Sequence, residues 1–166
     1  AKILEQQSEQ YETYLHAVGR DGIPFEVISS TVPQIEKEVN SILTQIAGFN
    51  AHFETDGKNV IPYIVYDDRK WPMSLSSGFE KFVSSIAIRV ALVNISNLPR
   101  SNNIIIDEGF GVLDSDNLAS MTTLFHYLKT QFDFVLIISH LDEMKDMVDN
   151  MIEIKNENGF SKVNYV

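Results

Sequence analysis

Residues 103–114 read Asn-Ile-Ile-Ile-Asp-Glu-Gly-Phe-Gly-Val-Leu-Asp, an apolar run that ends in two adjacent carboxylates and a glycine-bracketed turn. The three consecutive isoleucines are typical of a parallel strand that is covered on both faces. Ligand sites of parallel sheets lie at the carboxyl ends of such strands. Asp107 can hold Mg²⁺ there while Glu108 acts on a water nucleophile. The alternative is a plain strand end whose acids are merely solvated.

A second apolar run, residues 134–138, ends at Ser139-His140. The residues between the two runs carry apolar side chains at helical spacing, which predicts a helix over 115–130. A strand, a crossover of this length and a second strand form a right-handed parallel unit. His140 therefore emerges at the same edge of the sheet as the paired acids, although a lone histidine after a strand is usually structural.

A serine- and glycine-containing turn, Leu75-Ser76-Ser77-Gly78-Phe79-Glu80-Lys81, opens a strongly apolar helix predicted over 79–97. The free N–H groups at the start of a helix, together with the helix dipole, form an anion site. Ser76 adds a hydroxyl donor, and the alternative is an ordinary serine N-cap. A phosphate donor, a metal-binding acid, a base for water and a histidine together suit nucleotide hydrolysis.

The remaining sequence predicts helices and hairpins around these motifs. Residues 2–18 place Leu4, Tyr11 and Val18 at a period of seven, which indicates a coiled-coil stripe or an ordinary amphipathic helix. Because this helix has no cap at residue 1, we expect it to be cut from a longer one. The other expected elements are a helical turn at 24–29, a helix that begins near Pro33 and ends at Gly48, strands at 52–55 and 60–66, a polar loop at 67–70, a helix at 141–148, and a hairpin of 151–155 with 162–166.

Composition restricts the classes of function. The chain has 166 residues, enough for one domain with a real core, and a formal net charge of −10. Such an acidic chain is not by itself a strong binder of DNA or membranes, although a larger assembly that contains it can bind DNA. It has no cysteine, which excludes disulfides and zinc–thiolate sites. No apolar run is long enough to span a bilayer, and no signal peptide is visible.

The order of these motifs resembles the C-terminal half of ATP-binding-cassette ATPase heads. Residues 75–79 look like the signature motif, 104–108 like Walker B, 111–114 like the D-loop, and His140 like the H-loop. Within that superfamily, residues 107–114 and 138–144 are most similar to the SbcC-type, SMC-like ATPases of DNA double-strand-break repair. Residues 33–40 are similar to the segment in which the returning coiled coil re-enters that head.

This resemblance implies an α/β fold, the C-terminal lobe of an ABC-type P-loop ATPase head. A parallel sheet flanked by helices would be followed by a terminal hairpin. Residues 1–20 would be the end of the returning coiled-coil helix, and residues 21–166 the ATPase lobe. The implied cofactors are ATP and Mg²⁺.

Roles follow from the resemblance residue by residue. Asp107 would anchor Mg²⁺, Glu108 would orient or deprotonate the attacking water, and His140 would contact the γ-phosphate. Asp114 would lie at the interface between two heads. The ATP-binding signature residues Ser76, Ser77 and Gly78 would contact the nucleotide of the opposite head.

The sequence departs from the family in two places. The family signature usually has two glycines followed by Gln or Glu, whereas Ser77 occupies the first glycine position here and Glu80 is displaced by one. A Cβ at position 77 restricts the turn. No Gly-x-x-x-x-Gly-Lys-Ser/Thr motif occurs either, so the Walker A loop would be supplied by an N-terminal half of the same ATPase, with its Q-loop.

The implied partners are that N-terminal half, a second head as a homodimer, a nuclease subunit, and DNA through the assembly, with no membrane. The implied location is intracellular, either cytoplasmic or associated with the nucleoid or nucleus. Two alternatives stay open: a chromosome-organising SMC head and an ATP-dependent interaction module that does not hydrolyse. A transporter ATPase is disfavoured by the heptad lead-in.

Overall fold

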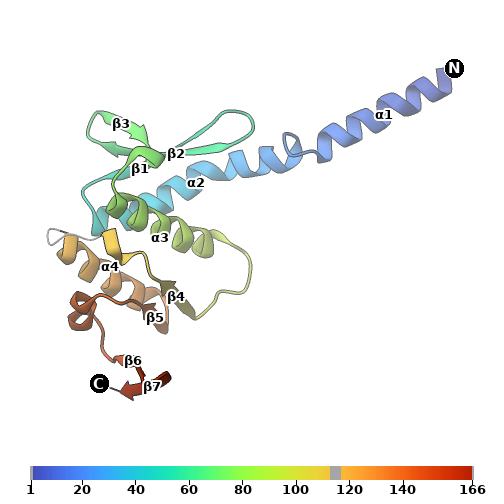
Figure 1. Cartoon of the computed structure of the whole chain (residues 1–166). Helices are drawn as coiled ribbons and strands as arrows, with labels where there is room; N and C mark the ends of the chain where they lie inside the picture. Colours follow the sequence, from blue (N-terminus) through green and yellow to red (C-terminus); the bar gives the residue numbers. More distant parts are fainter. Residues whose placement is uncertain (1, 113–116, 166) are drawn as a thin grey trace. The chain divides into compact units, whose positions relative to one another are not determined.

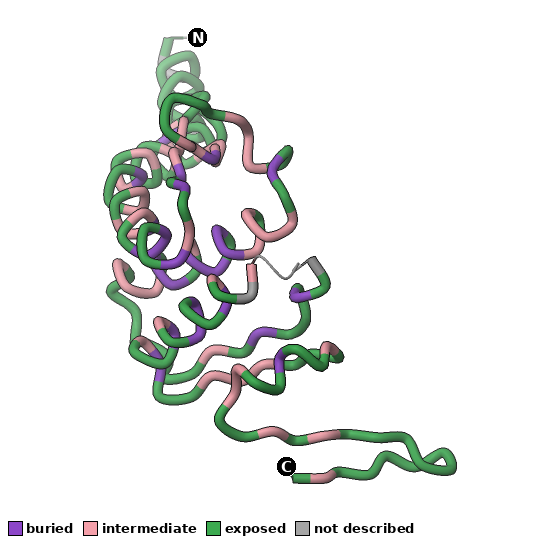
Figure 2. The backbone as a smooth tube through the Cα atoms, turned by 90° about the vertical axis from the view of Figure 1, so that its left-hand side faces the viewer, coloured by how far each residue is buried: buried purple, intermediate pink, exposed green. Residues whose placement is uncertain are grey.

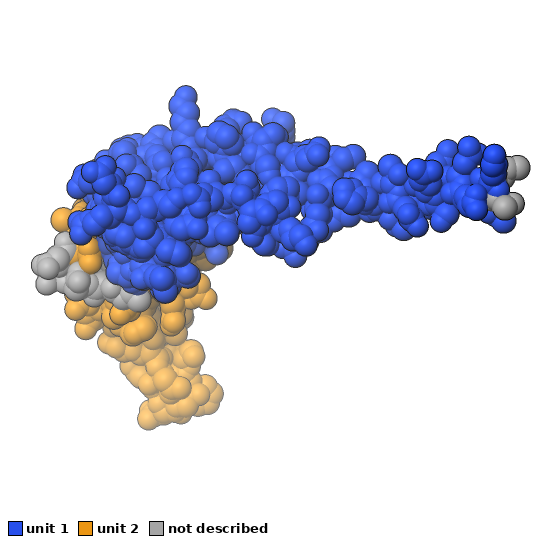
Figure 3. Space-filling view, turned by 90° about the horizontal axis from the view of Figure 1, so that it is seen from above, with its two compact units in different colours: residues 1–100 blue, residues 101–166 orange. Residues whose placement is uncertain are grey.

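The computed structural model describes residues 2–112 and 117–165, which form two compact units, residues 1–100 and 101–166 (Figure 3). The two units are described separately below. Within the described residues, no helix combines the length and apolar character needed to cross a membrane.

The first unit begins with two successive helices, α1 (Lys2–Val18) and α2 (Ile23–Ile46), separated by a tight break (Figure 1). The break requires glycine, because a Cβ at Gly22 would lie 2.3 Å from the carbonyl oxygen of His16. The side chains of Leu4, Tyr11 and Val18 are exposed along α1, and the tube is almost entirely green there (Figure 2). The expected helix over 2–18 is therefore confirmed, with its apolar stripe uncovered.

Pro33 lies inside α2, not at the start of a helix as the sequence predicted. The separate turn at 24–29 and the following helix form one continuous element. A proline inside a helix removes one N–H donor and disfavours the preceding turn. The hydroxyl groups of Ser30 and Thr31 both donate to the carbonyl oxygen of Val27 in that region, at 2.8 and 2.9 Å. Both bonds thus share one backbone acceptor in the turns before the proline.

An antiparallel sheet of three strands follows: β1 (Asn50–Thr55), β2 (Val60–Tyr66) and β3 (Arg69–Pro72), in the order β1-β2-β3. The first two strands confirm the expected hairpin. The third was predicted as a polar loop, and that prediction was wrong. Asp67 adopts a φ of 47°, which allows the tight turn that pairs Tyr66 with Arg69.

Helix α3 (Gly78–Ile95) packs against α2, which also contacts β1. The expected helix over 79–97 is thus confirmed within two residues. Buried apolar residues of α2 and α3 together form the core of this unit, and Figure 2 colours buried residues purple. The core side chains that are less than 2% exposed are Val39, Ile42, Leu43, Ile64, Val83, Ala87, Val90 and Ala91.

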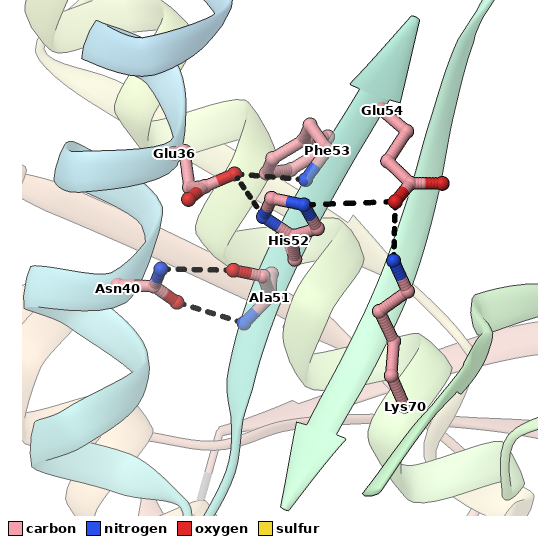
Figure 4. A network of polar contacts seen from close by, with 7 residues as sticks. All are labelled: Glu36, Asn40, Ala51, His52, Phe53, Glu54 and Lys70. Carbon is pink, nitrogen blue, oxygen red and sulfur yellow. Dashed lines mark hydrogen bonds and ion pairs between the residues drawn. The ribbon is translucent and has the colours of Figure 1, made fainter. Parts of the chain in front are cut away.

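Polar side chains join α2 to β1 (Figure 4). The Asn40 side chain donates to the carbonyl oxygen of Ala51 at 2.9 Å and accepts from the Ala51 N–H at 2.7 Å. One turn earlier, Glu36 accepts from the Phe53 N–H at 2.8 Å, and the same oxygen lies 2.9 Å from His52 Nδ1. These contacts fix the helix along the strand.

The second unit contains a parallel pair, β4 (Asn103–Asp107) and β5 (Phe134–Ile138), connected through α4 (Leu118–Gln131). Both predicted strands and the helix between them are confirmed. Hairpin β6 (Ile152–Glu157) and β7 (Phe160–Tyr165) is confirmed too. Asn158 and Gly159 both have positive φ at its turn.

The helix expected over 141–148 is present as a 3₁₀ helix over residues 142–147. One expectation for this unit was wrong, because the strands are not buried on both faces: Ile106 is 6% exposed, but Ile105 and Phe134 are 57% and 58% exposed. A parallel pair of only two strands cannot cover both of its faces.

Candidate functional site

The carboxyl end of β4 carries the paired acids. Asp107 is the last residue of the strand and is aligned with Ile138, the last residue of β5. The N–H of Glu108 donates to the carbonyl oxygen of Ile138 at 2.9 Å, which extends the pairing by one further bond. Both acids are exposed at this edge, as the sequence predicted for a strand end that serves a ligand.

Glu108 has an unusual backbone conformation. Its φ is 59° and that of Gly109 is 95°, so the chain reverses immediately after the strand. Glycine adopts positive φ at no steric cost, but a residue with a Cβ does not. Strained backbone of this kind is concentrated at functional sites.

His140 lies beside Glu108. Its Nδ1 atom is 3.7 Å from Glu108 Oε1, and the side chains are 74% and 68% exposed. The prediction that His140 emerges at the same edge as the acids is therefore confirmed. The two residues border a pocket of about 250 Å³. Its lining is Glu108, Gly109, Phe110, Gly111, Ser139, His140 and Leu141.

Asp107 fits a magnesium ion that is shared with a nucleotide. Among the described residues, no cluster of three or more His, Asp or Glu side chains could hold a metal ion by itself. Mg²⁺ in phosphoryl-transfer sites commonly uses one or two carboxylates, with water and substrate phosphates as its other ligands. An exposed carboxylate at the end of β4 meets that requirement. Asp114 lies outside the described residues.

The signature-like turn belongs to the first unit. The Ser76 hydroxyl donates to the carbonyl oxygen of Met73 at 2.7 Å, and Ser76 is only 8% exposed. Ser77 is the N-cap of α3 and is exposed. The two adjacent serines thus differ in exposure: the Ser76 hydroxyl is turned inward, whereas Ser77 is exposed.

Glu80 completes a capping box with Ser77. The Glu80 N–H donates to Ser77 Oγ at 3.2 Å, and the Ser77 N–H donates to Glu80 Oε2 at 2.7 Å. These bonds satisfy two backbone donors, whereas the amides of the first helical residues have no partner within the helix. The sequence contained the signal for this arrangement, a serine followed three residues later by glutamate before an apolar run. The role of Glu80 is therefore a local one that motif comparison missed.

Aromatic residues support this turn from the sheet. The rings of Tyr66 and Trp71 are stacked, with centroids 5.5 Å apart, and Phe49 lies 5.5 Å from Tyr66. Burial, together with the hydrogen bond and negative charge of Glu80, raises the pKa of Tyr66 to about 12. Tyr66 therefore links the sheet to the capping box.

No protein-family model matches the sequence. The chain is 36% identical over 170 residues to an uncharacterised protein of Acanthamoeba polyphaga mimivirus, covering 92% of this chain and 13% of that protein. It is 26% identical over 135 residues to the DNA double-strand break repair Rad50 ATPase of Pyrococcus abyssi, covering 81% and 15%. It is 30% identical over 105 residues to the SbcC subunit of the nuclease SbcCD of Staphylococcus aureus, covering 61% and 10%.

Solved structures agree on the fold. A chain from a study of ATP-driven dimerisation and DNA-stimulated activation of SMC ATPases matches with a TM-score of 0.69 at 18% identity, covering 85% of this chain and 88% of that one. The Pyrococcus furiosus Smc head with an extended coiled coil, bound to the C-terminal domain of ScpA, matches with a TM-score of 0.66 at 18% identity, covering 99% and 42%. The chain has the fold of SMC head domains.

The chain has Rad50 and SbcC among its sequence relatives, as its motifs predicted. The chain spans between about a tenth and a seventh of the length of the curated relatives cited above. Within the second unit, the structure brings together Asp107, Glu108 and His140 at one sheet edge. Ser76, Ser77 and Gly78 lie together at the start of α3 in the other unit.

Proposed function

We propose that this segment supplies the Walker B, D-loop, H-loop and signature elements of an ATP-hydrolysing head in DNA double-strand-break processing. The observation that carries the proposal is the pairing of Glu108 with His140, 3.7 Å apart at the carboxyl end of the parallel strands that also holds Asp107. This edge of a parallel sheet is where nucleotide sites are built. Exposure of all three side chains leaves them accessible to a ligand.

Each residue receives one role in the proposal. Asp107 holds Mg²⁺, which when bound neutralises charge on the nucleotide phosphates. Glu108 orients or deprotonates the attacking water, because a carboxylate beyond the strand end can reach a water at the γ-phosphate. His140 contacts the γ-phosphate from the same exposed sheet edge as Glu108. Asp114 lies at the interface between heads.

The signature turn acts on the nucleotide of a second head. Ser76 points inward in this structure, so Ser77, Gly78 and the backbone amides of the first turn of α3 form the accessible part of the motif. A γ-phosphate there would meet N–H donors that have no partner within the helix, together with the positive end of the helix dipole. ATP would then hold two heads together, and hydrolysis would release them.

The complete protein would combine this segment with an N-terminal half that carries Walker A and the Q-loop. A second head, a nuclease subunit and DNA bound by the assembly would complete the complex, in the cytoplasm or associated with the nucleoid or nucleus. Support comes from the relatives Rad50 and SbcC, whose names refer to double-strand-break repair and to a nuclease. The exposed stripe of α1 suits a coiled-coil arm.

The test compares this chain alone with this chain plus the N-terminal half. We expect negligible ATP hydrolysis by the 166-residue chain and Mg²⁺-dependent hydrolysis by the combination, because the phosphate-binding loop comes from the other half. Full ATP turnover by the chain alone would contradict the proposal. An N-terminal half with an altered Walker A lysine is the matched control.

A second candidate function is a chromosome-organising SMC head, favoured by the SMC heads among the solved structures, one bound to a domain of ScpA. Purification of the complete protein with its partners distinguishes the two. A co-purifying nuclease supports the repair function, and a bridging subunit without nuclease activity supports the alternative.

A further inference from the structure

We propose that Phe110 is a positioning residue for Glu108: its buried ring fixes the reversed turn after β4 and so keeps the Glu108 carboxylate beside His140. This inference rests on the proposed function, in which Glu108 acts on water. It assigns a functional role to an apolar residue inside the turn, which motif comparison leaves without one.

The first step is that Glu108 cannot be held by its own side chain. That side chain is 68% exposed, and its neighbour His140 is 74% exposed. Two exposed side chains do not fix one another's position, because each loses rotamer freedom to do so. The direction of the carboxylate is therefore set by the backbone at residue 108.

The second step is that this backbone is strained and must be held from outside. Glu108 has a φ of 59°, a conformation that costs free energy for any residue with a Cβ. Such conformations persist only when the surrounding structure imposes them. On the preceding side, the Glu108 N–H is bound to the carbonyl oxygen of Ile138 at 2.9 Å.

The third step identifies the anchor on the following side. Between Glu108 and Phe110 lies only Gly109, whose φ of 95° gives no rigidity of its own. Phe110 is 1% exposed, and its ring packs edge-on against Phe125 of α4, with centroids 5.9 Å apart and planes at 68°. Aromatic pairs of this geometry are favourable beyond the area they bury. Phe110 therefore ties the turn to the core of the second unit.

The experiment uses the complete protein with Phe110→Leu, and with Phe132→Leu as the matched control. Phe132 is also buried in this unit, at 6% exposure, but it follows α4 and not β4. We expect both variants to lower the melting temperature. Only Phe110→Leu should lower kcat, by about tenfold or more, with KM for ATP changed much less, because misplacing a reacting group mainly affects the chemical step. An unchanged kcat, or equal losses in both variants, would overturn the proposal.

A double substitution separates positioning from general loosening. If Phe110 acts through the Glu108 carboxylate, Phe110→Leu should lower kcat no further once Glu108→Gln is present. A full additional loss in that background would show that Phe110 acts by another route.

A stability measurement keeps this inference distinct from the proposed function. Glu108→Gly should raise the melting temperature when Phe110 is present, because glycine relieves the strain, and should raise it less in Phe110→Leu. Equal gains in the two backgrounds would overturn the inference, even in a protein that hydrolyses ATP. If these gains differ as expected but Glu108→Gln leaves turnover unchanged, the positioning of the turn stands and the proposed catalytic role fails.

Discussion

The two candidate ligand-binding turns differ in how their backbone conformations are stabilised. The turn before α3 satisfies its own backbone through the capping box of Ser77 and Glu80, and it turns the Ser76 hydroxyl inward. The turn after β4 begins with two exposed acids, Asp107 and Glu108, and the backbone of Glu108 is strained. The first turn has capping bonds of its own in addition to its contact with Tyr66, whereas the second has a strained residue held by the core beneath it. The capping bonds favour the conformation of the first turn, whereas the conformation of Glu108 persists only because the surrounding structure imposes it.

The largest effect that tests this contrast is expected from Glu108→Gln in the complete protein. The change keeps the shape and removes the charge, so ATP binding should persist while turnover falls about 10²- to 10⁴-fold, the usual contribution of a general base. Single-turnover hydrolysis and nucleotide binding, measured side by side, check this. Unchanged turnover would remove Glu108 from the water-activating role.

A substitution in the core of the second unit should loosen the turn after β4 but not the turn before α3. Leu128 is fully buried in α4, and Leu128→Ala should destabilise the second unit by about 2–5 kcal/mol through a cavity. Hydrogen exchange should accelerate at residues 104–112 and stay unchanged at residues 77–81, whose bonds are local. Leu43→Ala, which alters a fully buried residue of the first unit, is the matched control. Equal acceleration at both turns in Leu128→Ala would contradict the contrast.

Removing the cap should affect only the signature turn. Ser77→Ala should cost about 1 kcal/mol, because the Glu80 N–H loses its acceptor. Glu80→Gln is the control, since its amide oxygen can still accept from the Ser77 N–H. Chemical unfolding measures both variants. A loss in Glu80→Gln as large as in Ser77→Ala would show that charge, and not the capping bonds, stabilises the turn.

The effect confined to the narrowest range of conditions is a dependence of stability on pH, which appears only above pH 10. The pKa of Tyr66 is raised from its ordinary value of 10.0 to about 12, so the folded state retains a proton that the unfolded state releases at lower pH. This contribution to stability is complete below pH 10 and is lost as the pH rises toward 12. Tyr66→Phe should flatten the loss over that range. If stability falls with pH equally steeply in Tyr66→Phe, the loss comes from other titratable groups.

The sequence predicted most of what depends on local pattern. The β-branched run at 104–106 and the apolar run at 134–138 indicated both parallel strands, and Asn158-Gly159 indicated the last hairpin. Pro33 was misplaced because the tertiary packing of the buried face of α2 outweighs the local preference against proline inside a helix. The third strand was missed because Arg69 and Lys70 carry no apolar alternation, and only pairing with β2 makes them a strand.

The sequence predicted which residues of the candidate site lie together, but not their local conformations. The juxtaposition of Glu108 and His140 followed from the parallel order of two strands. The inward hydroxyl of Ser76 and the positive φ of Glu108 did not follow from pattern, because each depends on contacts with residues that no spacing rule names. The buried ring of Phe110 is of the same kind.

The contacts of α2 with β1 have a consequence beyond fixing a helix. In the sheet order β1-β2-β3, β1 is an edge strand, and Asn40 and Glu36 occupy backbone groups on its open side. An open edge can recruit a strand from another molecule and begin aggregation. Two polar side chains therefore occupy backbone groups of β1 that a strand of another molecule would otherwise bind, which disfavours aggregation at this edge.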